Sequence, residues 1–344
     1  MMKNWLGATA LGLFWAGATV AEPTYTLMTF DDLTDWATDD HEAALTVFTD
    51  TCGDMKNPEW AGLCAFAKTA PDARAFFESF FQPVLVQDGD PMLFTGYFEP
   101  ELKGSKTRGG PYQYPIYRLP PDHIAGQEYI TRRQIEENQP LAGKELEIAW
   151  LTDPVDLFFL QVQGSGRIRL PDGGGMRVGY GGKNGFEYSS VGQELIRRGT
   201  YKPHQVSAQV IRNWVRDNPT DGQKLLWVNK SYVFFREVSE VPADKGPLGA
   251  MNRSITAHRS IAVDPAFTTL GTPVWIEKEG AAPIHRLMVA QDTGSAIKGA
   301  QRADIFYGTG DQAGRIAGRI KDGGRMIRLL PIQMAYKLLP ETIK

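Results

Sequence analysis

The stretch VAQDTGSAIKGAQRADIFYG, residues 289–308, places Asp292 in an Asp-Thr-Gly triplet directly after a short apolar run. A second aspartate, Asp304, follows twelve residues later, again beside apolar residues. The triplet is typical of an aspartic protease, in which two such loops bring two carboxylates together to share one proton. The chain has a single Asp-Thr-Gly and no Asp-Ser-Gly. The sequence therefore disfavours a protease and leaves a metal site, or an acid for some other bond.

Asp264, in the segment SIAVDPAF, shares the small and apolar neighbours of Asp292 and Asp304. A carboxylate in such a context is partly buried, and the loss of hydration raises its pKa. The group can then stay protonated near neutral pH and act as a general acid. The alternative for each aspartate is a turn cap that accepts backbone hydrogen bonds. Asp264, which precedes Pro265, is the most turn-like of the three.

Other site chemistries find little support in the chain. The histidines are scattered and form no His-x-x-x-His pair, and no calcium-type alternation of Asp and Asn occurs. Ser165 in QGSGR lacks the full Gly-x-Ser-x-Gly of an esterase. The glycine-rich segment GYGGKNG stands among predicted strands and does not open a helix, as a phosphate-binding loop would. We expect neither a metal nor a cofactor.

A reaction on a sugar is the kind of site chemistry that remains. The β-like part of the chain is rich in tyrosines, whose rings can face the C–H surface of a pyranose, although most aromatic residues in β domains simply pack. Polar side chains in the same part have groups suited to sugar hydroxyls and acetamido groups: Gln161, Gln163, Ser165, Lys183 and Asn184.

Length and composition predict two ordinary globular domains. The chain has 344 residues, 42% of them hydrophobic, and its net charge is only -3. So small a charge gives no general attraction to nucleic acid or to an anionic membrane. A substrate must therefore be inferred from local motifs.

The N-terminus resembles an export signal. Lys3 precedes the apolar run WLGATALGLFWAGATVA, which ends in small residues and predicts a signal peptide at residues 1–21 with cleavage after Ala21. An uncleaved anchor is the alternative. No cysteine lies at the predicted cleavage site, so no lipid anchor is expected there. In an oxidising compartment Cys52 and Cys64 are expected to form a disulfide, with two buried free thiols as the alternative.

The pattern along the chain is mainly β with N-terminal helices. Residues 39–82 show helical periodicity, and from Pro83 onward short strands alternate with turns, including all of IAWLTDPVDLFFLQVQGSGRIRLP. Helices are predicted near 191–198 and 207–217, strand returns in LLWVNKSYVFFREV, and the best linker lies near residue 240.

Several segments together resemble one family. FTGYFEP (94–100), YPIYRLP (114–120), FFLQVQGSGRIRLPDGG (158–174), VGYGGKNGFEYSSVGQELIRRG (178–199) and NKSYVFF (229–235) resemble the membrane-bound lytic murein transglycosylase A family. Residues 246–276 and 288–308 are similar to its C-terminal three-aspartate module. The likeness runs in unbroken order over about residues 93–330.

This resemblance implies a two-domain fold with a substrate groove between the domains. Residues 22–100 and 240–344 would form a double-psi β-barrel domain, and residues 101–239 a smaller β-barrel-like domain inserted into it. The linker near residue 240 would then be the point where the chain returns to the barrel.

The resemblance also implies an activity. The family is a class of peptidoglycan lyases that cleave the β-1,4 bond between N-acetylmuramic acid and N-acetylglucosamine without water and leave 1,6-anhydromuramoyl ends. Asp304 would be the catalytic acid, Asp292 a supporting carboxylate, and Asp264 a structural or supporting residue. The implied groove residues are Thr95, Gly96, Tyr97, Gln163, Ser165, Lys183 and Asn184.

The expected partners are peptidoglycan glycan strands, with other cell-wall enzymes as further candidates and no nucleic acid. We expect a monomer in the periplasm; outer-membrane association is the alternative that the family name suggests. Two other functions remain open: a non-catalytic peptidoglycan-binding protein and a muramidase that uses water. The muramidase would need a second carboxylate, for which Glu99, Asp172 and Glu187 are the local candidates.

Overall fold

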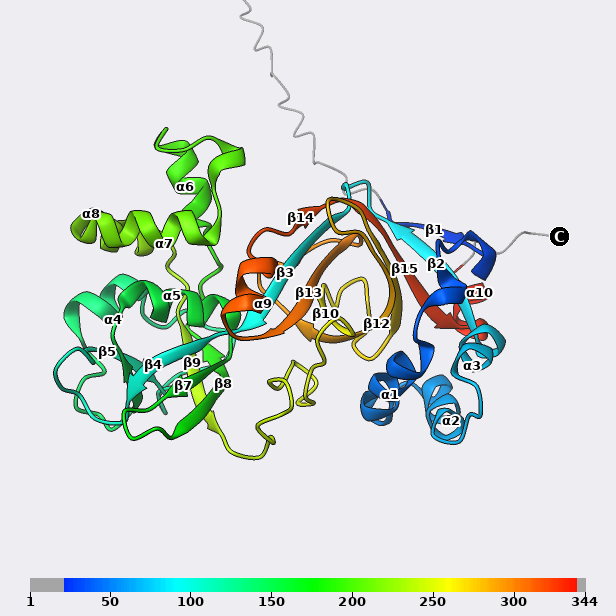
Figure 1. Cartoon of the computed structure of the whole chain (residues 1–344), viewed down its shortest axis with the longest axis horizontal. Coiled ribbons are helices and arrows are strands. Elements are labelled where there is room, and N and C mark those ends of the chain that lie inside the picture. The colour runs from blue at the N-terminus through cyan, green and yellow to red at the C-terminus, as the bar shows by residue number, and fades with distance from the viewer. Residues whose placement is uncertain (1–21, 339–344) are drawn as a thin grey trace, which may run out of the picture.

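The computed structural model describes residues 22–338, so the predicted signal peptide lies outside the described residues. The chain forms a nine-stranded and a six-stranded sheet that lie side by side (Figure 1). The nine-stranded sheet contains, in spatial order, β1 (Thr24–Leu27), β2 (Phe81–Gln87), β15 (Gly324–Pro331), β11 (Pro273–Lys278), β12 (Ile284–Thr293), β10 (Ser260–Val263), β13 (Arg302–Thr309), β3 (Leu93–Glu99) and β14 (Lys321–Asp322).

Both ends of the chain contribute to the nine-stranded sheet. β13, from the C-terminal part, pairs parallel with β3 and antiparallel with β10, and β10 pairs parallel with β12. Within residues 22–338 this sheet runs from β1 to β14 without closing into a barrel. Helix α9 (Gly310–Ala317) lies against β3 and β13, and α10 (Ile332–Lys337) packs beside β2 and β15.

The predicted N-terminal helices are confirmed as α1 (His41–Thr51), α2 (Pro58–Ala67) and α3 (Ala73–Phe80). Each begins at a side-chain cap, supplied in turn by Asp40, Asn57 and Asp72. Their apolar faces bury a cluster of aromatic rings against the sheet. A disulfide joins Cys52, in the short 3-10 turn after α1, to Cys64 of α2.

The six-stranded sheet lies between β3 and β10 in the sequence. Its strands, in spatial order, are β5 (Tyr114–Tyr117), β6 (Glu147–Leu151), β4 (Glu101–Ser105), β7 (Gly166–Arg169), β8 (Gly175–Lys183) and β9 (Val233–Val238). Its helices are α4 (Arg132–Asn138), α5 (Pro154–Gln163), α6 (Val191–Arg197), α7 (Ala208–Asp217) and α8 (Pro219–Leu226). The predicted helices at 191–198 and 207–217 are thus confirmed.

The prediction of strand at residues 154–163 is wrong, because these residues form α5. Asp153 caps its first turn, Pro154 occupies the first helical position, and Gly164 ends the helix with a positive φ of 78°. The helix is apolar on several sides because it packs into two separate hydrophobic clusters, one with the sheet and one with α6, α7 and α8. This removes the one-sided periodicity by which an amphipathic helix is recognised. The first residues of LLWVNKSYVFFREV likewise complete α8, and strand begins only at Val233.

A buried carboxylate joins the two sheets. Glu99, the last residue of β3, is fully buried and forms ion pairs of 2.8 Å with Arg167 of β7 and with Arg177 of β8. The Thr309 hydroxyl of β13 donates to the same carboxylate at 2.8 Å. Both arginines also donate to the carbonyl of Lys245, on the segment that returns from β9. Because a buried charge is tolerated only when paired and hydrogen-bonded, Glu99 stabilises the junction in one arrangement.

No helix among residues 22–338 is long and apolar enough to cross a membrane.

Candidate active site

The strand register brings Asp292 and Asp304 into one row. Ala262 of β10 stands opposite Asp292 of β12 on one side and opposite Asp304 of β13 on the other. Asp304 is in turn opposite Thr95 of β3. Residues in register on neighbouring strands project from the same face, and the small, buried Ala262 separates the two carboxylates. We call Thr95, Asp304, Ala262 and Asp292 the aspartate row.

Asp304 lies below the protein surface, with part of its side chain still exposed. The Thr95 hydroxyl donates to its Oδ1 at 2.7 Å. Burial raises the pKa of Asp304 to about 6, and the nearby negative charge of Asp292 acts in the same direction. The hydrogen bond from Thr95 and the positive charge of Arg302 oppose this increase. The carboxyl group therefore exchanges its proton close to neutral pH.

Asp292 is equally desolvated but is held more firmly. Its Oδ1 accepts the backbone N–H of Ala250 at 3.0 Å and that of Thr293 at 2.9 Å, and Tyr97 donates its hydroxyl to Oδ2 at 3.0 Å. Burial raises the pKa of Asp292 to about 6 despite these three donors. All three donors favour the ionised carboxylate, so Asp292 is suited to carry a negative charge beside Asp304.

Tyr97 remains a neutral donor. Burial and the nearby Asp292 and Asp304 raise the pKa of its phenol well above the usual value. Its ring packs against Phe306, two residues beyond Asp304 on β13, with 5.2 Å between the ring centroids. Ile255, Ala262 and Ile297 complete this small apolar cluster next to the aspartate row.

Asp264 is occupied by turn contacts. It is buried; its Oδ1 accepts the N–H of Ala266 at 3.1 Å, and its Oδ2 accepts the N–H of Gly299 at 3.0 Å. These bonds connect the loop after β10 to the loop before β13. The position fits the structural alternative considered for Asp264.

Gly96 serves packing on the far side of β3. A Cβ atom there would approach the Cα of Ala317 in α9 and the ring of Tyr307, each to 2.8 Å. Glycine therefore lets α9 lie close against β3, on the face opposite to the aspartate row. Contact of Gly96 with substrate stays a prediction.

Three predicted groove residues come from the six-stranded sheet and its helices. Gln163, at the end of α5, accepts the N–H of Phe98 at 2.9 Å and so links α5 to β3. Ser165 follows in the connection to β7 and is buried. Lys183, at the end of β8, is partly exposed and lies 3.3 Å from Glu187. Their roles toward substrate stay predictions.

The assignment of Asn184 to substrate binding needs correction. Its side chain is fully buried, and its Nδ2 donates to the carbonyls of Ile130 and Lys230 at 2.8 and 2.9 Å. Its Oδ1 accepts the N–H of Tyr232 at 2.8 Å. Both ends of the amide are thus used inside the domain, and none of it reaches a surface that a glycan could contact.

The structure also bears on the carboxylates that a muramidase would need. Glu99 is fully buried between two arginines, Asp172 caps the exposed turn between β7 and β8 by accepting the N–H of Gly174, and Glu187 is 79% exposed. None of the three belongs to the aspartate row. Among the described residues no group of three potential metal ligands occurs either.

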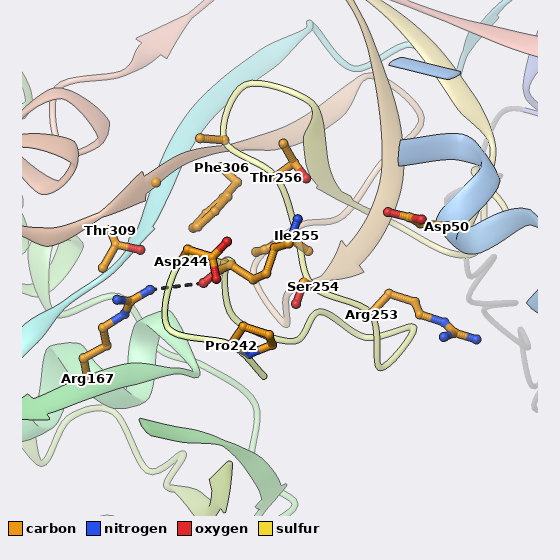
Figure 2. Close-up of a pocket in the computed structure, with 14 residues that line it drawn as sticks. Asp50, Arg167, Pro242, Asp244, Arg253, Ser254, Ile255, Thr256, Phe306 and Thr309 are labelled. Atoms are coloured by element: carbon orange, nitrogen blue, oxygen red, sulfur yellow. Dashed lines mark hydrogen bonds between the residues drawn. The ribbon is translucent and has the colours of Figure 1, made fainter. Parts of the chain in front are cut away.

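A cavity of about 570 Å³ lies where the two sheets meet (Figure 2). It is lined by Arg167 of β7, the returning segment from Pro242 to Gly246, the loop from Arg253 to Ala257 and the end of β13. Phe306 connects the cavity to the aspartate row, since it lines the cavity and packs against Tyr97. The row itself does not line the cavity.

Arg302 belongs to the site although no sequence motif singles it out. Its Nη2 donates to the Thr95 hydroxyl at 2.9 Å, two residues before Asp304 on the same strand. Strand alternation was the available signal, because residues two apart project from the same face. The backbone N–H of Ala250, which fixes Asp292, was also missed, and no side-chain pattern marks it.

Two family models match this chain. The MltA specific insert domain matches residues 93–236, from β3 to β9, and the 3D domain matches residues 259–330, which contain Asp264, Asp292 and Asp304. Together they define a protein in which an MltA-type insert is combined with a three-aspartate module.

Individual relatives agree. Membrane-bound lytic murein transglycosylase A of Escherichia coli (strain K12) is 38% identical over 241 residues, which are 68% of this chain and 64% of that relative. A crystal structure of membrane-bound lytic murein transglycosylase from Agrobacterium tumefaciens has a TM-score of 0.82 at 33% identity, covering 92% of this chain and 100% of that one. E. coli MltA with bound chitohexaose has a TM-score of 0.70 at 28% identity, covering 87% and 90%. The chain belongs to the membrane-bound lytic murein transglycosylase A family.

Proposed function

We propose that this chain is a lytic transglycosylase. It cleaves the β-1,4 bond between N-acetylmuramic acid and N-acetylglucosamine in peptidoglycan without water and forms 1,6-anhydromuramoyl ends. The observation that carries the proposal is the pair of desolvated aspartates in one row, each with a pKa of about 6, in a chain of this family. The chitohexaose bound to E. coli MltA, which is a β-1,4-linked glycan, supports this substrate class.

In the first step protonated Asp304 transfers its proton to the glycosidic oxygen, and the C1–O bond breaks. Positive charge develops at C1 and the ring oxygen, and ionised Asp292 stabilises it electrostatically. In the second step the 6-hydroxyl of the same muramoyl residue attacks C1, and Asp304, now a carboxylate, accepts the hydroxyl proton. The enzyme returns to its starting protonation state.

An internal nucleophile explains why one acid is enough. A glycosidase that uses water needs a second carboxylate as base or nucleophile. A hydroxyl already attached to the reacting ring has a high effective concentration and needs less assistance. The locations of Glu99, Asp172 and Glu187 outside the aspartate row favour this route over hydrolysis.

Other features are part of the same proposal. We infer that residues 22–100 and 240–344 form one domain, which is built on the nine-stranded sheet and is equivalent to the double-psi β-barrel domain of the family, and that residues 101–239 form the inserted one. The glycan would lie in a groove between them, contacted by Thr95, Tyr97, Gln163, Ser165 and Lys183. We propose a monomer that acts in the periplasm.

The test is digestion of purified sacculi with the purified protein, followed by mass spectrometry of the released muropeptides. We expect 1,6-anhydro ends. Asp304→Asn should abolish product release and still sediment with sacculi, whereas Asp221→Asn, a matched change at an exposed residue of α8, should behave as wild type. Reducing ends would indicate a muramidase, and binding without any product would indicate a non-catalytic binding protein.

A further inference from the structure

Arg302, Thr95 and Asp304 form a chain of hydrogen bonds whose directions are set by chemistry. A guanidinium group can only donate, so the Nη2–H of Arg302 donates to Thr95 Oγ1 at 2.9 Å. A hydroxyl has a single hydrogen, and Thr95 Oγ1 lies 2.7 Å from Asp304 Oδ1. With one lone pair of Oγ1 already bonded to Arg302, the hydroxyl hydrogen points at Oδ1.

Arg302 is itself fixed by the backbone. Its Nη1 donates to the carbonyl of Ala303 at 2.7 Å and to that of Leu93 at 3.2 Å, one on each of the two paired strands. The guanidinium is half-buried, so its orientation does not depend on a flexible surface partner. The hydrogen-bonded chain therefore begins at the sheet and ends at one oxygen of Asp304.

We propose that Arg302 and Thr95 are positioning residues that confine the transferable proton of Asp304 to its Oδ2. Oδ1 accepts from Thr95 in both protonation states, so it has no reason to carry the proton. Oδ2 would then give its proton to the glycosidic oxygen and take one back from the 6-hydroxyl. The inference rests on the proposed function, in which Asp304 is the general acid.

The surroundings of Asp304 decide how its titration should respond. The charged and titratable groups close enough to interact with it include Arg302 and Tyr307 on its own strand. Tyr97 on β3 and Asp292 on β12 are the others, and β10 presents only Ala262. The Thr95 hydrogen bond and the Arg302 charge both lower the pKa of Asp304, against burial and Asp292. Removal of either should raise this pKa, and should also slow the reaction because the proton is no longer held on one oxygen.

The experiment compares Thr95→Val, Thr95→Ser and Arg302→Gln. Thr95→Val keeps the shape and removes the hydroxyl, so we expect kcat to fall about tenfold or more, KM to change much less, and the alkaline limb of the kcat profile to move to higher pH. Thr95→Ser should recover most of the lost rate. Arg302→Gln should shift the limb in the same direction. Thr26→Val on exposed β1 and Arg169→Gln, at the exposed last residue of β7, are matched controls.

A double variant tests whether the two residues act together. If Arg302 acts through Thr95, adding Arg302→Gln to Thr95→Val should change kcat little further. If the two residues act independently, the fold reductions in kcat of the two single variants should multiply. A rise in KM with unchanged kcat and an unmoved pH limb would leave Thr95 with a sugar contact alone and no positioning role, and would overturn the proposal. Unchanged kcat and pH limb in Thr95→Val would overturn it as well.

A second measurement separates this proposal from the proposed function. The pKa of the Asp304 carboxyl can be followed by carbon-13 NMR in the free protein, where no turnover is required. A higher pKa in both Thr95→Val and Arg302→Gln is expected, and an unchanged pKa in both would contradict the positioning role. A wild-type protein that releases no anhydro ends would refute the transglycosylase function, whatever this titration shows.

Discussion

At the scale of single residues, two carboxyl groups with similar pKa values must hold opposite protonation states. The proposed reaction needs Asp304 protonated and Asp292 ionised, and burial raises the pKa of each to about 6. The two titrations are coupled, so the profile reports the pair. We expect a bell-shaped dependence of kcat on pH with its maximum near pH 6. Below the maximum kcat falls because Asp292 becomes protonated, and above it kcat falls because Asp304 becomes ionised. Steady-state rates on soluble glycan strands would measure it, and a rate that climbs steadily into alkaline pH would contradict it.

The same burial makes Asp304 a cost to folding at neutral pH. Its folded-state pKa of about 6 lies above the ordinary value of 3.8, so between these values the folded protein holds more protons than the unfolded chain. Stability therefore falls as pH rises from about 3.8 to about 6 and stays lower above that range. Asp304→Asn removes this penalty. We expect thermal denaturation to show a stabilised variant at pH 7.5 and a much smaller difference at pH 3.5.

If Asp304→Asn raised the denaturation temperature equally at both pH values, its higher stability would have an origin other than the carboxylate charge. Asp221→Asn, which lies on the surface of α8, should show no such pH dependence.

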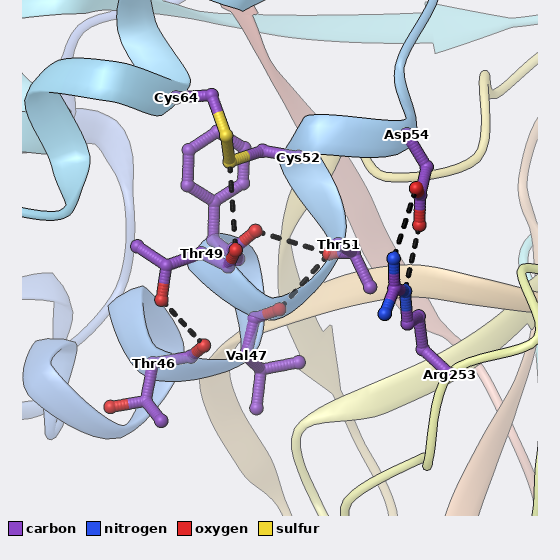
Figure 3. Close-up of a disulfide and its surroundings, with 9 residues drawn as sticks. Thr46, Val47, Thr49, Thr51, Cys52, Asp54, Cys64 and Arg253 are labelled. Carbon is purple, nitrogen blue, oxygen red and sulfur yellow. Dashed lines mark hydrogen bonds and ion pairs between the residues drawn. A yellow bond between two sulfur atoms is a disulfide. The ribbon is translucent and has the colours of Figure 1, made fainter.

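At the scale of elements, the disulfide supports the loop that holds Asp292. Just after Cys52, Asp54 pairs with Arg253 through two hydrogen bonds of 2.8 and 3.1 Å (Figure 3). Arg253 belongs to the loop whose Ala250 N–H donates to Asp292. Loss of the cross-link between Cys52 and Cys64, which are 12 residues apart, should lower the free energy of unfolding by roughly 3 kcal/mol.

The paired replacement Cys52→Ser and Cys64→Ser tests this by urea denaturation. Reductant should destabilise the wild type and leave the double variant unchanged. Because the Asp54–Arg253 pair is exposed and contributes little by itself, we expect kcat to fall only severalfold. An unfolding free energy that is equal with and without the disulfide would contradict the expected contribution.

Elements also show what a sequence can and cannot predict. The helices α1 and α3 follow from caps and one-sided apolar periodicity, and α2 from its Asn57 cap and Pro58, all of which are local signals. Helix α5 was mistaken for strand because it is buried on more than one side. Motifs singled out Asp304 and Asp292, but only the register of β12, β10, β13 and β3 places them in one row with Thr95.

Asn184 illustrates the opposite error. A polar residue beside Lys183 in a glycine-rich segment suggested a sugar contact, yet its amide bonds Ile130, Lys230 and Tyr232 inside the domain. These partners lie 46 to 54 residues away in the sequence, so no local pattern reveals them. Exposed and buried amides look alike in a sequence, because the distinction depends on long-range packing.

At the scale of the whole molecule, Glu99 holds the two sheets in a fixed relation. Its carboxylate pairs with Arg167 and Arg177, accepts from Thr309, and shares both arginines with the carbonyl of Lys245. The proposed substrate groove would depend on this junction, because Gln163 contacts β3 from the six-stranded part and Asp304 lies on the nine-stranded sheet. Glu99→Gln keeps the volume and removes the charge, which leaves two buried or half-buried arginines without their anion.

We expect Glu99→Gln to lower the free energy of unfolding by about 3 to 5 kcal/mol, because removal of one member of a buried ion pair leaves its partners uncompensated. Glu237→Gln, at the exposed residue of β9, is the matched control and should change stability little. Urea denaturation measures both variants. At temperatures where Glu99→Gln remains folded, a looser junction should raise KM for glycan strands more than it lowers kcat, and the products should keep their 1,6-anhydro ends. Loss of all product by a variant that is folded and still binds sacculi would instead place Glu99 in the chemistry and favour the muramidase.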